Sequence, residues 1–261
     1  MNADYHVHTY YSDDSECPME NMVKQAITLG LDEIAFTEHV DYGVKTDLNC
    51  SYDAYFKEIE LLKRKYSDRI AIKAGIEFGV QAHTIRQFGQ DFARYPFEFI
   101  ILSNHQIDDR EFWNLEFQEG KTQEEFQRAY YEAIYDVARQ FKDFSVLGHL
   151  DMIKRYDPYG SYPDEKIMEL VDRILRLVIA DGKGIELNTS CFRYGLPDLT
   201  PSRAILKRYL ELGGRIITIG SDAHEEKHLG GHIAEAKEIL KEIGYTQFCT
   251  FDKMEPVFWD L

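Results

Sequence analysis

The chain has 261 residues, 44% of them hydrophobic, and a formal net charge of −16 at pH 7. It can therefore bury a substantial core, but its charge argues against binding long nucleic acids over a general basic surface, because phosphate neutralisation needs clustered lysine and arginine. A small anionic substrate is compatible with this charge, since one cation-rich pocket can hold it.

The expected compartment follows from the apolar pattern and the cysteines. No apolar run reaches the length of a membrane span, and the N-terminus lacks the basic and apolar segments of a signal peptide. The cysteines are far apart and form no C-x-x-C pair, so we expect free thiols in a reducing compartment. They are Cys17, Cys50, Cys191 and Cys249. We therefore expect a cytoplasmic protein with no membrane partner, and the sequence leaves the oligomeric state open.

Predicted strands recur along the whole chain as short apolar runs bounded by turn residues. They are expected at Asp4–Thr9, Glu33–Thr37, Ile70–Phe78, Phe97–Leu102, Ser145–Gly148, Gly184–Asn188 and Arg215–Ile219. Each run is followed by a connection long enough for a helix, so the pattern is typical of repeated strand–helix units.

The connections carry helix signals. Pro18 is well placed as the first residue of a helix, Ser51 can cap the next, and Thr122 with Glu125 has the spacing of a capping box. Residues Gln106–Lys121 are expected to form a long loop. Helices are expected at about Pro18–Leu29, Tyr52–Tyr66, His83–Ala93, Thr122–Phe141, Pro163–Asp181, Thr200–Leu212 and Ile233–Ile243.

Seven strand–helix units predict a parallel sheet covered by helices. Closed on itself, such a sheet is a distorted (β/α)7 barrel, similar to a TIM barrel and built as one domain over residues 1–261. An open doubly wound sheet is the alternative. The barrel is favoured because residues able to bind metal follow nearly every strand, whereas an open sheet would concentrate them at one switch point.

His6 and His8 lie one residue apart on the first predicted strand. Residues i and i+2 of a strand point to the same face, so both imidazoles can bind one ion. Histidine, aspartate or glutamate recurs at the ends of six of the seven units, and these residue types bind divalent metals. The candidate ligands are His6, His8, Asp13, His39, Glu77, His105, His149, Asp222 and His224. The pattern predicts a multinuclear metal site at the C-terminal ends of the strands.

The order of these residues resembles a known family. The H-x-H strand, the Thr37-Glu38-His39 turn, the isolated Glu77, two isolated histidines and the late Asp-x-His resemble the polymerase and histidinol phosphatase (PHP) superfamily over essentially the whole chain. Longer stretches resemble its histidinol-phosphate phosphatase branch. They are Gly148–Tyr156, Glu186–Ser190 and Gly220–His224, the last followed by Leu229-Gly230.

This resemblance implies up to three divalent metal ions, whose identity among zinc, manganese and iron the ligand set leaves open. The implied ligands are His6, His8, Glu77 and Asp222 for the first ion, a bridging Glu77 with His105 and His149 for the second, and Asp13, His39 and His224 for the third. Some relatives have histidine at the position of Asp13. A carboxylate there favours a harder ion.

The implied reaction is hydrolysis of a phosphate ester. Two metals about 3.5–4 Å apart can share a water and direct the resulting hydroxide at phosphorus. Arg155 and Arg193 follow strand ends and are the candidate catalytic and substrate-binding groups, because a guanidinium binds phosphate through two parallel hydrogen bonds. Trp113 and the pair Asp108-Asp109, in the long loop, suit the imidazole and amine of histidinol phosphate.

The resemblance therefore implies a histidinol-phosphatase of histidine biosynthesis, a phosphoric monoester hydrolase that acts on L-histidinol phosphate. Three alternatives stay open. The chain could act on another phosphate ester, such as a nucleotide. It could be a metal-dependent amidohydrolase, although those usually place a lysine ligand after a middle strand and Lys73 lies inside one. It could be a non-catalytic metal-binding module, which needs only a closed shell of four ligands.

Overall fold

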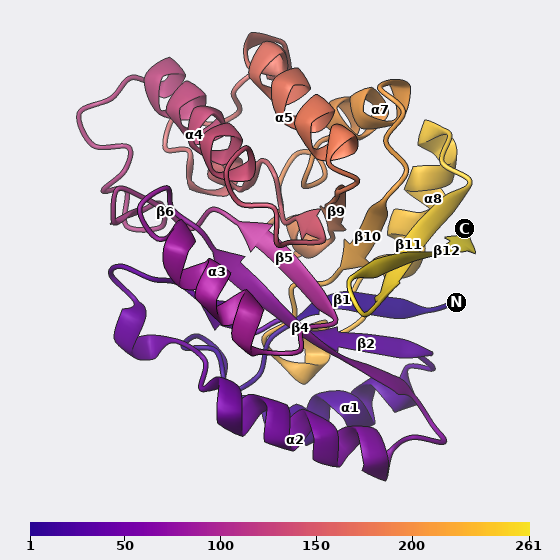
Figure 1. Cartoon of the computed structure of the whole chain (residues 1–261). Helices are drawn as coiled ribbons and strands as arrows, with labels where there is room; N and C mark the ends of the chain where they lie inside the picture. Colours follow the sequence, from indigo (N-terminus) through magenta and orange to yellow (C-terminus); the bar gives the residue numbers. More distant parts are fainter.

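A computed structural model describes residues 1–261 and shows seven parallel strands in a nearly closed barrel, with the helices on its outside (Figure 1). The strand order is β1-β2-β4-β5-β8-β9-β10. The strands are β1 Ala3–Val7, β2 Glu33–Phe36, β4 Ala71–Gly79, β5 Phe99–Ser103, β8 Val146–Leu147, β9 Gly184–Asn188 and β10 Ile217–Gly220. The predicted distorted (β/α)7 barrel is confirmed.

The first and last strands of this order, β1 and β10, meet beside His6 and His8. Val7 forms a parallel bridge with Ala223, and the backbone N–H of His8 donates to the carbonyl of Ala223 at 2.8 Å. Closure therefore brings the H-x-H segment next to the chain that follows β10. A short strand, β3 (His39–Val40), pairs with the end of β4 and sets His39 opposite Glu77.

A β-bulge in β1 aims the histidines. Asp4 pairs with Ile34 and Val7 with Phe36, so Tyr5 and His6 together face the single residue Ala35 of β2. An extra residue of this kind turns two consecutive side chains to one side of the sheet. The side chains of Tyr5 and His6 therefore both point into the barrel. The ordinary alternation of a strand places His8 on the same side as His6.

The helices follow the prediction closely in the middle of each element and less closely at their ends. They are α1 Met19–Thr28, α2 Tyr52–Lys65, α3 Ile85–Arg94, α4 Gln123–Ala138, α5 Met168–Ala180, α6 Ser190–Arg193, α7 Arg203–Glu211 and α8 Ile233–Ile243. The capping box of α4 is confirmed, since the Thr122 hydroxyl accepts from the N–H of Glu125 and the Glu125 carboxylate accepts from the N–H of Thr122. None of the helices is both long and apolar enough to span a membrane.

Two predicted helices begin later than expected. The turn after Pro163 is a 3-10 helix, Asp164–Lys166, and α5 follows it. Helix α7 begins after Ser202, whose hydroxyl accepts from the N–H of Ile205, rather than at Thr200. In both places a proline lies ahead of the helix, Pro163 in extended backbone and Pro201 at a bend, and a later residue starts the helical hydrogen bonds. The predicted loop Gln106–Lys121 contains a small hairpin, β6 (Gln106–Ile107) and β7 (Arg110–Glu111).

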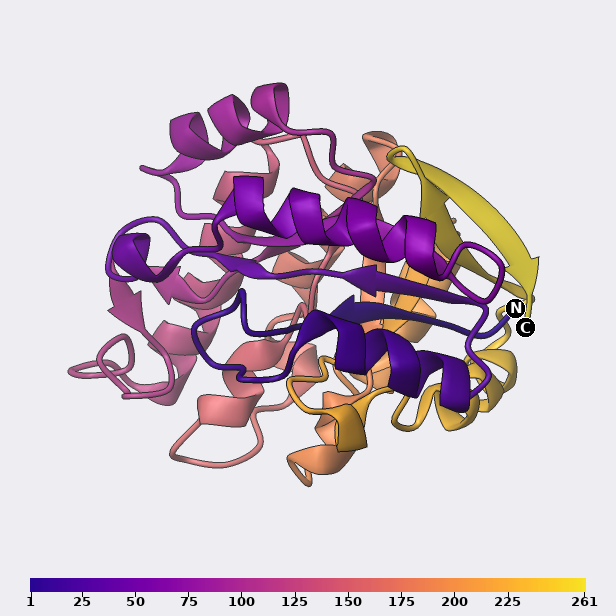
Figure 2. The same ribbon diagram turned by 90° about the horizontal axis from the view of Figure 1, so that it is seen from below.

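A C-terminal hairpin, β11 (Gln247–Asp252) and β12 (Glu255–Asp260), was not predicted. It lies near the chain termini, where the barrel strands begin (Figure 2). Phe251 donates its backbone N–H to the Tyr5 hydroxyl at 2.8 Å and packs its ring on Phe99. These contacts belong to a small core inside the barrel. It consists of Ala3, Tyr5, Ala35, Phe99, Ile101, Val146, Cys249 and Phe251. The hairpin thus covers one end of the barrel and leaves the C-terminal strand ends for the site.

Candidate metal centre

Four predicted ligands converge around one point inside the barrel. The Nε2 atoms of His6 and His8 lie 3.2 and 3.5 Å from Oε2 of Glu77, and 3.9 and 3.7 Å from Oδ1 of Asp222. Around a tetrahedral zinc with bonds of about 2.0–2.2 Å, neighbouring ligand atoms lie about 3.3–3.6 Å apart. The spacing of these four groups therefore fits one divalent ion between them.

The other oxygen of Glu77 faces a second pair of histidines. Oε1 lies 3.2 Å from Nε2 of His105 and 2.9 Å from Nε2 of His149. The Ser103 hydroxyl donates to the same oxygen at 2.6 Å and fixes the carboxylate plane. Glu77 is fully buried, and a buried carboxylate needs positive charge beside it, which an ion facing each oxygen would supply. This geometry suits the predicted bridging role.

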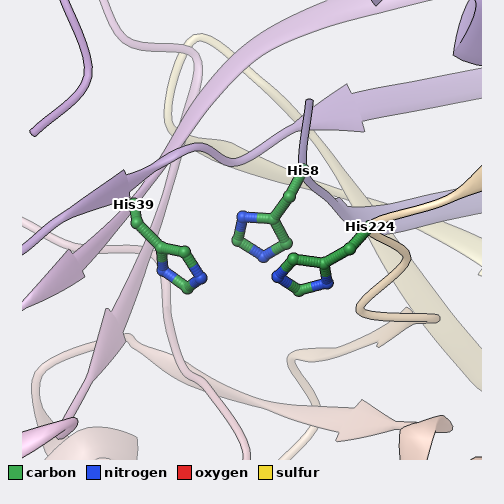
Figure 3. A group of neighbouring side chains, drawn as sticks. All are labelled: His8, His39 and His224. Carbon is green, nitrogen blue, oxygen red and sulfur yellow. The ribbon is translucent and has the colours of Figure 1, made fainter. Parts of the chain in front are cut away.

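The third group of ligands lies at the surface side of the first. His8, His39 and His224 stack face to face, with ring centroids 4.1 and 4.2 Å from His8 (Figure 3). The carboxylate that approaches them belongs to Asp14, whose Oδ2 lies 3.6 Å from Nε2 of His39 and 3.2 Å from Nε2 of His224. Asp14 therefore stands where the sequence predicted Asp13.

Asp13 points elsewhere and forms an ion pair with Lys45 at 3.0 Å. The turn after β1 explains this choice between two neighbouring aspartates. The Ser12 hydroxyl donates to Glu38 at 2.7 Å and accepts from the N–H of His39 at 3.0 Å, which anchors the turn inside the barrel. With Ser12 held, the next two side chains leave the turn in different directions, and residue counting alone does not say which one returns to the histidines.

The predicted ligands other than Asp13 meet in one cluster, and several of their buried polar atoms have no hydrogen-bond partner. These atoms are Nε2 of His6, His8 and His224, Nδ1 of His39, and Oε2 of Glu77. Leaving such atoms unpaired costs about 1–3 kcal/mol each. A concentration of them at one place indicates that they are ligand atoms, and the mixed imidazole and carboxylate set fits divalent first-row metals.

The opposite ring nitrogens of three histidines are held by residues that sequence analysis did not single out as part of the site. The Nδ1–H of His6 donates to Glu186 at 2.6 Å, that of His105 to Asp41 at 2.9 Å, and that of His8 to Ser12 at 3.1 Å. The carboxylates only accept, and the Ser12 hydroxyl already donates its proton to Glu38, so in all three histidines the proton lies on Nδ1 and the Nε2 lone pair is free for a metal. The signal for Glu186 in the sequence was a glutamate inside an otherwise apolar strand.

The charges of the cluster are balanced internally. Burial alone would lower the pKa of His6, but the carboxylates of Glu186 and Glu77 raise it well above its usual range. Asp41 and Glu77 likewise outweigh burial and raise the pKa of His105 to about 9. The surrounding imidazoles hold the pKa of Glu77 well below its usual range despite burial. The carboxylates stay ionised, and a divalent ion would supply the positive charge that protons supply without it.

A cavity of about 550 Å³ opens onto this cluster. Arg155 lines it, with its guanidinium 3.9 Å from the ring of Tyr194, one Nη2 hydrogen bond of 2.7 Å to Ser190, and a buried Nε that has no partner. Trp113 also lines the cavity and is 63% exposed. Glu111 is the carboxylate next to it.

The remaining predicted substrate contacts lie away from the cavity wall. Arg193 donates to the carbonyl oxygens of Ser221 and Asp222 at 3.3 and 2.9 Å, so the structure places it behind the turn that carries Asp222. Asp109 accepts from Gln81 and lies 3.2 Å from His83, and it does not line the cavity. Arg193 was predicted from its distance after a strand end, and Asp109 from its place with Asp108 in the long loop. Neither position determines the direction of a side chain.

The strand ends of this (β/α)7 barrel place histidines and carboxylates beside a cavity that an arginine lines. This combination of fold and site is that of a metal-dependent hydrolase. Residues 4–190 match the model of the PHP domain. The chain belongs to the PHP family, in its histidinol-phosphatase branch.

Relatives that match over nearly the full length of the chain support the assignment to the histidinol-phosphatase branch. The histidinol-phosphatase of Lactococcus lactis is 36% identical over 256 residues, which cover 97% of this chain and 95% of that protein. A crystal structure of the Lactococcus lactis histidinol phosphate phosphatase, complexed with zinc, L-histidinol and phosphate, superposes with a TM-score of 0.91 at 35% identity and covers 98% of both chains. A structure from Listeria monocytogenes shares the fold, with a TM-score of 0.74 at 20% identity, and covers 89% of this chain and 99% of its own.

Replacing Asp14 with asparagine is expected to weaken the third metal position, because Asp14 is the carboxylate that faces His39 and His224. We expect at least about tenfold weaker binding of one zinc ion per chain, measured as metal retained against a competing chelator. The matched Asp13→Asn variant loses only an ion pair with Lys45 and should keep its metal. The opposite outcome, metal loss in Asp13→Asn alone, would restore Asp13 as the ligand.

Proposed function

We propose that the chain is a histidinol-phosphatase, which hydrolyses L-histidinol phosphate to L-histidinol and phosphate in histidine biosynthesis. The observation that carries the proposal is the position of Glu77 between two pairs of histidines, beside a cavity that His105, His149 and Arg155 line. A full-length relationship to the Lactococcus lactis enzyme supports the same activity. As part of the proposal, residues 1–261 act as one barrel domain in the cytoplasm, where four unpaired cysteines suit a reducing compartment.

The proposed centre takes up to three divalent ions, with zinc as the first choice because the Lactococcus lactis structure contains it. His6, His8, Glu77 and Asp222 would hold the first, Glu77 with His105 and His149 the second, and Asp14, His39 and His224 the third. Bound ions of this kind supply a nucleophilic hydroxide at neutral pH and neutralise charge on the phosphoryl oxygens. No serine or cysteine nucleophile is then needed.

The chain's own residues bind and orient the substrate around that chemistry. The guanidinium of Arg155 is held by Ser190 and by the ring of Tyr194, and Arg155 lines the cavity, where its guanidinium can donate to a phosphate oxygen. Stacking on Tyr194 fixes the plane of the guanidinium before the substrate arrives, which lowers the entropic cost of orienting it.

The organic end of the substrate would lie toward the β7–α4 loop. Trp113 offers an exposed ring on which an imidazole can stack, and Glu111 offers a carboxylate for an ammonium group. This pair replaces the predicted combination of Trp113 with Asp108 and Asp109. A cavity with an aromatic face, a carboxylate and an arginine suits a phosphate ester whose alcohol is cationic.

The test is a product analysis with L-histidinol phosphate. The zinc-loaded chain should release phosphate and L-histidinol in equal amounts, because the reaction is a simple hydrolysis. Removal of metal with a chelator should abolish the release, and added zinc should restore it. Phosphate release that is insensitive to chelation would contradict the proposed mechanism.

A further inference from the structure

Strand β9 contributes none of the predicted metal ligands, yet it carries a buried polar set at its C-terminal end. Glu186, Asn188 and Ser190 are all fully buried, and they lie beside β10 and β8 in the barrel. A buried carboxylate in a barrel strand is costly unless hydrogen bonds satisfy it. The partners of this set therefore indicate what it is for.

Glu186 holds two of the candidate ligands, which come from different strands. Its Oε1 accepts from Nδ1–H of His6 at 2.6 Å, and its Oε2 accepts from the backbone N–H of His149 at 2.9 Å. The first bond selects the tautomer of His6 that leaves Nε2 free, and it fixes the ring plane. The second fixes the backbone at the point where His149 enters the cavity. One carboxylate thus sets the positions of a first-site ligand and a second-site ligand.

A glycine on the neighbouring strand, Gly220, makes room for the carboxylate of Glu186. A Cβ on Gly220 would lie 2.3 Å from Cβ of His6 and 2.6 Å from Oε1 of Glu186. Both distances are shorter than contacts between such atoms allow. Gly220 on β10 therefore permits the close approach of the His6 ring to Glu186.

The set continues from Glu186 to the arginine of the cavity. The side-chain amide of Asn188 donates to Oε2 of Glu186 at 3.2 Å and to Asp222 at 3.4 Å. Its carbonyl accepts from the N–H of Ser190 at 3.0 Å and from its hydroxyl. Ser190 accepts from Arg155 at 2.7 Å. The metal ligands and the phosphate-binding guanidinium are therefore joined by one continuous hydrogen-bonded path along β9.

We propose that Glu186 is a positioning residue of the catalytic centre, which orients His6 and His149 for metal binding and, through Asn188 and Ser190, keeps Arg155 in register with them. Its effect on turnover rests on the proposed function, whereas its effect on metal binding does not. Glu186 acts through these residues and does not itself contact the substrate.

Replacing Glu186 with glutamine tests this role with almost no change of shape. If the amide oxygen faces His6, the NH2 group meets the N–H of His149. If the amide is turned, the NH2 group meets Nδ1 of His6 and moves the imidazole proton to Nε2, the atom that should bind metal. The first orientation loses the hydrogen bond to His149, and the second places a proton on the nitrogen of His6 that should bind metal. We expect zinc affinity to fall about 10–100-fold, measured by competition with a chromogenic chelator, with a lower kcat even at saturating zinc.

Glu33→Gln is the matched control, since Glu33 is also a buried carboxylate on a barrel strand but contacts Tyr5 near the covered end. A general cost of removing a buried carboxylate would lower the Tm of both variants and leave zinc affinity unchanged. If Glu186→Gln does not fold, Glu186→Asp keeps the charge but is one methylene shorter, and it should bind zinc more weakly than the unaltered chain. Wild-type zinc affinity in either Glu186 variant would overturn the proposal. Normal zinc binding without phosphate release by the unaltered chain would instead refute the proposed function.

Discussion

Replacing Glu77 with glutamine is expected to lower kcat/KM for L-histidinol phosphate by at least about 10³-fold. Glu77 lies within 2.9–3.5 Å of the five histidines His6, His8, His39, His105 and His149, a density of contacts that no other carboxylate in the centre has. Glutamine keeps the volume of the side chain but removes its charge and one of its two acceptor oxygens. Two adjacent metal positions should therefore fail together.

The measurement that accompanies this kinetic result is the zinc content of the variant. We expect a loss of two tightly bound ions per chain, because the side chain would no longer bridge the two pairs of histidines. Glu33→Gln, at the covered end of the barrel, should retain both metal and activity. A Glu77→Gln enzyme with full zinc content and near-normal kcat/KM would show that Glu77 is not the bridge.

Replacing Arg155 with alanine is expected to lower kcat/KM by about 10²-fold, since hydrogen bonds to a charged group contribute about 1.5–3 kcal/mol each. The guanidinium stands at the cavity wall, 3.6 Å from Asp222 and stacked on Tyr194. Its removal should leave zinc content unchanged, because Arg155 is not a ligand. The loss should also be seen as weaker competitive inhibition by inorganic phosphate.

Two further variants test whether Arg155 acts through its paired hydrogen-bond donors or only through its positive charge. Arg155→Lys keeps the positive charge without the planar pair of donors, so it should recover only part of the activity. Arg208→Ala removes an arginine that pairs with Asp172 between α5 and α7, away from the cavity, and should leave kcat/KM unchanged. An Arg155→Ala enzyme with unaltered phosphate inhibition would remove this residue from the proposed site.

The barrel and most of its metal centre could be predicted from sequence because both depend on simple geometric rules. Alternation in a strand places His6 and His8 on one side, and parallel strands bring Glu77, His105 and His149 to one end. These rules need only the position of each strand end. The structure brings those residues together, although their binding of metal stays a prediction.

The features that sequence reasoning missed depend on turns and on neighbours distant in the chain. Asp14 rather than Asp13 approaches His39 and His224, in a turn after β1 that Ser12 anchors through its contact with Glu38. Arg193 bonds the backbone behind Asp222 because of the direction in which helix α6 leaves β9. Glu186 is conspicuous in the sequence as a glutamate inside an apolar strand, but only the fold shows that it contacts His6 of β1.

The C-terminal hairpin was missed for a different reason. Its strands are joined at Lys253 and Met254, both with positive φ, where hairpins usually have asparagine or glycine. The turn therefore gave no signal in the sequence. The hairpin still matters to function, because by covering the N-terminal end of the barrel it leaves the metal-bearing end as the open one.

The comparison of kcat/KM for L-histidinol phosphate, p-nitrophenyl phosphate and a nucleoside monophosphate, each with and without a chelator, tests the central claim most directly. We expect a preference of at least about 100-fold for L-histidinol phosphate over both other esters, because we propose that Trp113 and Glu111 bind its cationic alcohol, and we expect chelation to abolish all turnover. Equal turnover of the three esters would contradict the assignment of L-histidinol phosphate as the substrate, and turnover that survives chelation would contradict the metal centre itself.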